Sequence, residues 1–268
     1  TTVTGAGTCD QRSGDGSSVF LSDEVTEKTG HNWWGAQWGP YFTEQANSIV
    51  AKDYWNSKKV AIMYESRYCY LWARNFGARA QGWIAYLSGM YGYGYGAIDI
   101  WLYQSRYEID KETFNGLETI TPDDKRVEWS KSIEFESGYQ VGYMKQFFSK
   151  INWWKLIPDF SDEVYFNPDK GGANNEGKYP DTSIYACATD ANNTYVVYFY
   201  NKTANTGILG NMDANATYSA TWFNPRTNEY QAISQEIKAD TTDKNGKPGY
   251  KLPNKPDNSD WVVLVTKN

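Results

Sequence analysis

The sequence has little of what a metal site or a membrane span requires. It contains one histidine and three cysteines in 268 residues, and Cys9, Cys69 and Cys187 are too far apart to form a CxxC pair. A structural zinc site is therefore not expected, and at most one disulfide bond can form. No run of 18 apolar residues occurs, so no transmembrane helix is predicted. Nothing indicates a metal or another cofactor.

Positive charge is also scarce. The 26 basic residues are outnumbered by 32 acidic ones, which gives a formal net charge of -6. Nucleic acid is not an expected partner, because binding to phosphates needs a basic surface. The first residues, TTVTGAG, lack the charged and apolar regions of a signal peptide and are typical of a strand. A chain that begins inside a strand is expected to be a fragment or one part of something larger.

Aromatic residues are abundant instead. There are 12 Trp, 22 Tyr and 11 Phe, which together make 17% of the chain. Flat amphipathic rings stack on the C–H faces of sugars, so this composition suits a carbohydrate-handling protein. Aromatic side chains also fill cores and cover β-surfaces, and composition alone leaves both interpretations open.

The first half of the chain alternates between strand-like and helix-like segments. Proline at position 40 suits the first turn of a helix to about residue 56, and a second helix is predicted over Tyr70–Ser88. Strands joined by crossover helices are parallel, and four such units make half of a (β/α)8 TIM barrel. The four predicted strands are Thr1–Gly7, Gly30–Gly39, Lys59–Glu65 and Tyr91–Ile100.

The pattern changes from helical spacing to alternation near Ile151–Phe160. Before this boundary, a helix is predicted with apolar positions at Ile133, Val141, Met144, Phe147 and Phe148. After it, short strands are separated by Asn, Asp, Gly and Pro turns, which predicts an antiparallel β-sandwich, with a polar loop over 240–260. The strands are SIYACATD, NTYVVYFYN, ATYSATWFNP, EYQAISQEI and DWVVLVTKN.

Glu65 is the strongest catalytic candidate. It ends the apolar run Val60–Met63 and lies between Tyr64 and Tyr68. Glycoside hydrolysis needs a pair of carboxylates, and barrel enzymes present catalytic side chains at the carboxyl ends of their strands. A neighbouring phenol can hold a nucleophilic carboxylate in position. The alternative is a salt bridge from Glu65 to an arginine of the next helix.

Further candidates surround the single histidine. His31 precedes Trp33 and Trp34, which could form a stacking wall or belong to the core. No Ser or Cys nucleophile motif accompanies His31, so substrate binding is favoured over general base catalysis. Alternation of glycine and tyrosine over Tyr91–Gly96 predicts tyrosines, Tyr95 among them, on one face of a strand and bare backbone on the other. Asp99, just beyond, either points into the site or caps the next segment.

Several of these motifs occur together in one known family. The chain resembles the apiosidase-like glycoside hydrolases of the DUF4038 type, barrel enzymes with a C-terminal β-sandwich labelled as collagen-binding. The resemblance implies that Glu65 is the catalytic glutamate of the seventh barrel strand and that His31 lines the same cleft. The matching motifs are TVTGAG, TGH, KKVAIMYESRY, GMYGYGYGAIDIW, WWKLIPD, WFNPRTNEY and DWVVLV.

The resemblance also implies an incomplete barrel. It places strands 5–8 of the barrel in residues 1–155 and the sandwich in residues 156–268. The second catalytic carboxylate would lie on an N-terminal barrel half, present as a separate chain or as a missing segment. The exposed edges of half a barrel make such a partner expected.

The main hypothesis is therefore a retaining glycosidase acting on a plant or microbial polysaccharide. Glu65 is its expected nucleophile, and the substrate implies a secreted or cell-surface protein, extracellular or periplasmic. The expected sugar pocket consists of His31, Trp33, Trp34, Tyr64, Tyr68 and Tyr95. The alternative is a non-catalytic glycan- or matrix-binding protein.

Overall fold

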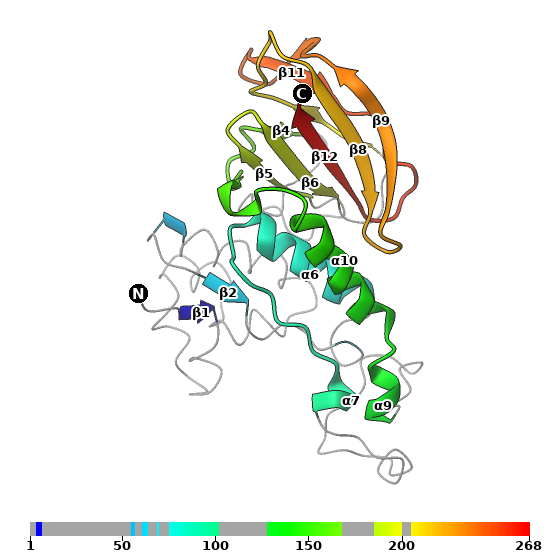
Figure 1. Ribbon diagram of the computed structural model, residues 1–268. Helices are drawn as coiled ribbons and strands as arrows, with labels where there is room; N and C mark the ends of the chain where they lie inside the picture. The colour runs from blue at the N-terminus through cyan, green and yellow to red at the C-terminus, as the bar shows by residue number, and fades with distance from the viewer. Residues whose placement is uncertain are drawn as a thin grey trace.

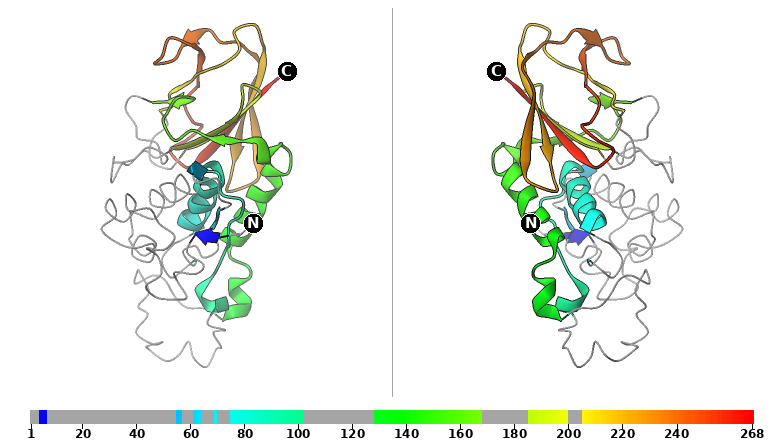
Figure 2. Two further views of the ribbon diagram at one scale, coloured as in Figure 1. Left: turned by 90° about the vertical axis from the view of Figure 1, so that its left-hand side faces the viewer. Right: turned by 90° about the vertical axis from the view of Figure 1, so that its right-hand side faces the viewer.

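Three layers make up the main part of the computed structural model (Figure 1). A four-stranded sheet and a six-stranded sheet form a β-sandwich, and two helices, α6 (Asn75–Leu87) and α10 (Glu136–Phe148), lie beneath it. The structure describes residues 4–6, 55–56, 61–63, 69, 75–101, 128–167, 185–199 and 205–268. Two side views show the same arrangement of sandwich and helices (Figure 2).

The six-stranded sheet confirms the predicted sandwich strands. Its order is β3-β5-β6-β12-β8-β9, and every neighbouring pair is antiparallel. The C-terminal strand β12 is central and pairs with β6 and β8 over six residues each. The strands are β3 (Ile157–Pro158), β5 (Tyr185–Asp190), β6 (Thr194–Phe199), β8 (Tyr218–Asn224), β9 (Glu229–Ile237) and β12 (Trp261–Lys267).

The four-stranded sheet corrects the prediction of one long loop over 240–260. Two of its strands, β10 (Thr241–Thr242) and β11 (Pro248–Lys251), lie in that polar segment. The others are β4 (Tyr165–Phe166) and β7 (Ile208–Leu209), in the order β10-β11-β7-β4. Strands of two to four residues carry too little alternation to be recognised from sequence.

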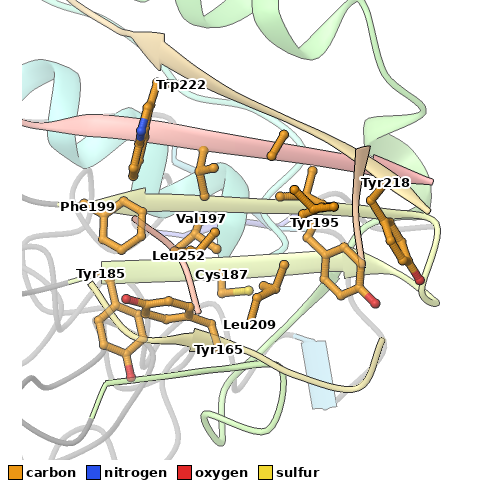
Figure 3. Packing of buried hydrophobic residues seen from close by; sticks show 14 of the residues in the cluster. Tyr165, Tyr185, Cys187, Tyr195, Val197, Phe199, Leu209, Tyr218, Trp222 and Leu252 are labelled. Carbon is orange, nitrogen blue, oxygen red and sulfur yellow. The ribbon is translucent and has the colours of Figure 1, made fainter. Parts of the chain in front are cut away.

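A first hydrophobic core fills the space between the two sheets. Its members include Tyr165 and Leu209 from the small sheet, and Cys187, Val197 and Trp222 from the large one (Figure 3). The ring of Tyr165 makes edge-to-face contacts with Tyr185 and Phe199, at centroid distances of 4.6 and 5.4 Å. Part of the aromatic excess therefore serves the core of the sandwich.

A second core lies between the large sheet and the two helices. Trp83 of α6 is at its centre, with ring centroids 5.1 Å from Phe147, 5.2 Å from Phe148 and 5.9 Å from Tyr198. Gly82 lets α10 approach, since a Cβ there would lie 3.0 Å from the Met144 methyl carbon. Both faces of β6 and β12 are thus buried, which explains the continuous apolar runs of these strands.

The predicted helices of the first half are partly confirmed. The α6 helix lies within Tyr70–Ser88, and the helix predicted before residue 151 appears as α9 (Trp129–Ser132) followed by α10. Met144, Phe147 and Phe148 are buried as expected. Ile133 was expected on the apolar face and is 58% exposed, because it follows α9 in the turn before α10 and lies outside the helical repeat.

Parallel pairing is present in the part of the chain before α6. Strand β1 (Thr4–Ala6) pairs in parallel with β2 (Ala61–Met63), with Ala6 opposite Met63. These two strands are direct neighbours, whereas strands in consecutive order would place the one predicted at Gly30–Gly39 between them. Residues 30–39 lie outside the described part of the chain, and the half barrel stays a prediction.

The strand predicted over Tyr91–Ile100 is wrong as a regular strand. Within residues 91–97 only Tyr93 and Ala97 form isolated bridges, Ala97 in parallel with Cys69, and Ile98–Trp101 is the short helix α7. Alternate glycines remove the side-chain packing that stabilises a strand, which accounts for the interrupted pairing. No helix in the described ranges is long and apolar enough to span a membrane.

Candidate active site

Most predicted site residues lie outside the described residues. These are Glu65, His31, Trp33, Trp34, Tyr64 and Tyr68, and their proposed roles stay predictions. Tyr95 is described, and so are several groups near Glu65 in sequence. These described residues form the structural framework of the candidate site.

The parallel pair β1–β2 forms the first part of this framework. Glu65 follows Met63, the last residue of β2, by two positions, and Met63 is level with Ala6 on β1. The carboxyl ends of both strands therefore meet at one edge. In parallel α/β barrels this edge carries the catalytic side chains.

A buried polar network holds the segment that follows Glu65. Cys69 lies four residues after Glu65, and its backbone N–H donates to the Gly96 carbonyl at 2.8 Å. The Ser137 hydroxyl on α10 donates to the Cys69 Sγ atom at 3.0 Å and lies 2.8 Å from the Tyr95 hydroxyl. Cys69 and Ser137 are fully buried. Ser137 therefore joins two chain segments to α10.

All three alternating tyrosines contact the helical layer. The Tyr93 hydroxyl donates to the Ala78 carbonyl of α6 at 2.7 Å, Tyr95 contacts Ser137, and the Tyr91 ring lies 5.7 Å from the ring of Trp153. These contacts give the tyrosines a common structural role, fixing the 91–97 segment against α6, α10 and the residues after α10. A sugar contact for Tyr95 stays a prediction.

Asp99 connects two short helices. It is in the first turn of α7 and is buried, and its Oδ2 atom accepts a hydrogen bond of 3.1 Å from the Ser132 hydroxyl of α9. The sequence left open whether Asp99 points into the site or caps a segment. The observed contact gives its carboxylate a partner within the helical layer.

A buried ion pair that sequence reasoning missed links the helices to the sandwich. Arg79 of α6 makes two hydrogen bonds to Asp260, of 2.7 and 2.8 Å, and also contacts the side-chain oxygen of Gln140 on α10. The Tyr198 hydroxyl donates to the same carboxylate at 3.2 Å. Burial opposes the charge of Arg79, but the bonds and charge of Asp260 outweigh it and raise the pKa of the guanidinium. The guanidinium of Arg79 therefore stays charged at neutral pH.

The described residues contain no cluster of potential metal ligands. They hold no group of three or more His, Cys, Asp or Glu side chains placed to bind a metal ion. The side chains of Cys69 and Cys187 are buried, and burial raises the pKa of the Cys187 thiol well above its usual value.

Comparison with protein families assigns both parts of the chain. Residues 25–155 match the family described as "Apiosidase-like, catalytic domain". Just under half of the chain is thus similar to an apiosidase-like catalytic domain. Residues 168–266 match the family described as "Putative collagen-binding domain of a collagenase". The apiosidase-like domain thus contains Glu65, α6 and α10, and the second match contains most of the sandwich.

Solved structures share this fold. One described as "Glycoside hydrolase" aligns with a TM-score of 0.61 and 16% identity, over 84% of this chain and 46% of its own. A glycoside hydrolase family 5 structure from Bacteroides vulgatus aligns with a TM-score of 0.57 and 16% identity, over 83% of this chain and 45% of its own. The chain therefore covers less than half of either structure. A search of curated proteins found no match.

Proposed function

We propose that this chain is part of a retaining glycoside hydrolase that acts on a plant or microbial polysaccharide. The match of residues 25–155 to the apiosidase-like catalytic domain carries the proposal. The position of Glu65 two residues after β2 supports its role as nucleophile. The barrel itself, with strands 5–8 in this chain, is part of the proposal.

The proposed reaction needs two carboxyl groups. One protonates the leaving glycosidic oxygen while Glu65 attacks the anomeric carbon, and the resulting covalent glycosyl ester is then hydrolysed by water. Retaining enzymes place these groups about 5–5.5 Å apart. We propose that the acid/base carboxyl belongs to an N-terminal barrel half that this chain does not contain. The alignments cover less than half of each matched structure, which supports this assignment.

The buried network beside the site has a positioning role in this proposal. Cys69 and Ser137 anchor the chain four residues after Glu65 to α10. A nucleophile must be held within a fraction of an ångström of its productive position, so its neighbouring backbone needs such support. The sugar would be bound by His31, Trp33, Trp34, Tyr64, Tyr68 and Tyr95, and we propose a secreted or cell-surface location.

The stereochemistry of the product tests the proposal. The assay uses this chain together with the N-terminal barrel half and a panel of plant and microbial glycans. Proton NMR recorded in the first minutes identifies the anomer released from each hydrolysed glycan. We expect the anomer of the substrate to be retained. Initial release of the opposite anomer would exclude Glu65 as a covalent nucleophile.

A non-catalytic matrix-binding protein is the second candidate. One observation favours it, the match of residues 168–266 to a family described by collagen binding. The two candidates differ in one measurable property, since only the hydrolase releases new reducing ends from a glycan. Binding to collagen without hydrolysis of any glycan in the panel would favour the second candidate.

A further inference from the structure

Two exposed aromatic rings contact one half-buried tryptophan. Trp154 is 58% exposed and Tyr91 is 47% exposed. The Trp153 ring lies 5.7 Å from Tyr91 and 6.3 Å from Trp154, and both contacts are edge-to-face. These two distances together limit the separation of the exposed rings to 12.0 Å at most. An oligosaccharide of a few residues spans such a length. Tyr91, Trp153 and Trp154 are called the aromatic platform below.

The platform rests on ordered aromatic packing. Trp153 also contacts the edge of Tyr86 at 5.9 Å, and Tyr86 stacks on the buried Phe148 at 4.9 Å. The contacts run from the second core through Trp153 to the surface. Rings held in this way lose little conformational entropy when a ligand binds, which favours binding.

Polar side chains adjoin the exposed indole. Asn152 and Lys155, on the same short turn as Trp154, are both exposed. Their amide and ammonium groups can hydrogen-bond to hydroxyl groups around a sugar ring. Exposed aromatic surface bordered by polar groups is typical of a binding site, because apolar surface left in contact with water is otherwise unfavourable.

We propose that the aromatic platform binds a polysaccharide chain as an accessory site. The inference rests on the proposed function for its choice of a glycan. A neutral glycan is favoured over a polyanionic one, because the chain carries a net charge of -6. The platform adjoins the junction of the two matched domains, at the end of residues 25–155. It would hold the polymer on the protein between cleavage events.

The test compares Trp154→Ala and Tyr91→Ala with Tyr139→Ala. Tyr139 is a matched control, since it is 54% exposed and lies in the first turn of α10, at the far end of the helix from the platform. Binding is measured by affinity electrophoresis of the chain with its barrel half in gels containing xyloglucan, arabinoxylan, galactan or polygalacturonate. We expect each platform variant to weaken binding of at least one neutral polymer by on the order of tenfold, equal to about 1.4 kcal/mol. Tyr139→Ala should bind as the wild type does.

Several results would overturn the inference. They are wild-type binding by Trp154→Ala, an equal loss in Tyr139→Ala, no binding of any polymer by the wild type, and a change from dimer to monomer in Trp154→Ala. The last result would assign the platform to a second copy of the chain. Hydrolysis is measured separately, so that the two proposals can fail independently. If Trp154→Ala weakens polymer binding and no glycan is hydrolysed, the aromatic platform is supported and the hydrolase is refuted. If a glycan is hydrolysed and Trp154→Ala binds polymers as the wild type does, the hydrolase is supported and the platform is refuted.

Discussion

Removing the Asp260 carboxylate should destabilise the junction between the helices and the sandwich. Asp260 is the partner of Arg79 in a bidentate pair whose side chains are 1% and 5% exposed. In Asp260→Ala, the guanidinium would remain buried without this carboxylate, and Tyr198 would lose its acceptor. We therefore expect the free energy of unfolding to fall.

The magnitude follows from burial. Breaking a buried ion pair by removing one partner costs about 3–5 kcal/mol, because the remaining charge stays desolvated. Replacing both partners with apolar side chains in Arg79→Met/Asp260→Leu should cost much less than the sum of the two single changes. This non-additivity distinguishes a buried pair from two independent contacts.

Urea denaturation followed by tryptophan fluorescence measures the effect, because Trp83 and Trp222 belong to the two cores. The matched control is Asp213→Ala, which removes a bond of 2.8 Å to Lys267 where both side chains are more than a third exposed. Asp213→Ala should change stability little, since exposed pairs are screened by solvent. Equal effects of Asp260→Ala and Asp213→Ala would refute the assignment of the energy to burial.

Two further predictions concern single buried groups. Ser137→Ala should destabilise the protein by about 1–3 kcal/mol, because it removes the hydroxyl between Cys69 and Tyr95. In the same denaturation assay Ser149→Ala, which removes an exposed hydroxyl, should have little effect. Equal effects of Ser137→Ala and Ser149→Ala would contradict the account. Burial lowers the pKa of Lys255 to about 8 from 10.5, so between pH 8 and 10 the folded protein loses a proton that the unfolded chain keeps, and the free energy of unfolding should rise with pH. Denaturation curves should show this rise in the wild type and a flatter profile in Lys255→Met, and a fall in the wild type over this window would exclude the lowered pKa.

The large sheet could be predicted from sequence because its strands are long. Strands β6 and β12 are six and seven residues long and consist mainly of β-branched and aromatic residues between turn residues, and they appear as expected. The second core could not be predicted. Burial of Val196 and Val197 on opposite faces of β6 shows a continuous apolar run, which does not reveal whether a helix or a sheet covers each face.

The Arg79–Asp260 pair shows what local patterns omit. The two residues are 181 positions apart, and each belongs to a different matched domain. Nothing in the sequence near either residue indicates the other. In residues 91–97 the prediction failed for a different reason. The alternation of glycine and tyrosine indicated a strand, but the glycines prevented a regular one.

Part of the candidate site could be predicted from sequence, and part is visible only in the structure. The apolar run before Glu65 indicated a strand, and β2 with its parallel partner β1 is consistent with a carboxylate at a strand end. The network of Cys69, Ser137 and Tyr95 could not be anticipated, because it joins three segments that are far apart in the chain. It anchors Cys69, four residues after Glu65, to α10.

Turnover by Glu65→Gln tests the central claim most directly. The variant is compared with wild type and with Glu134→Gln, which changes an exposed glutamate in the turn before α10. Each chain is assayed with the N-terminal barrel half for release of reducing sugar from the glycan that the wild type cleaves. We expect Glu65→Gln to lose hydrolysis while keeping the stability and glycan binding of the wild type, and Glu134→Gln to retain full activity. Wild-type turnover by Glu65→Gln would contradict the account.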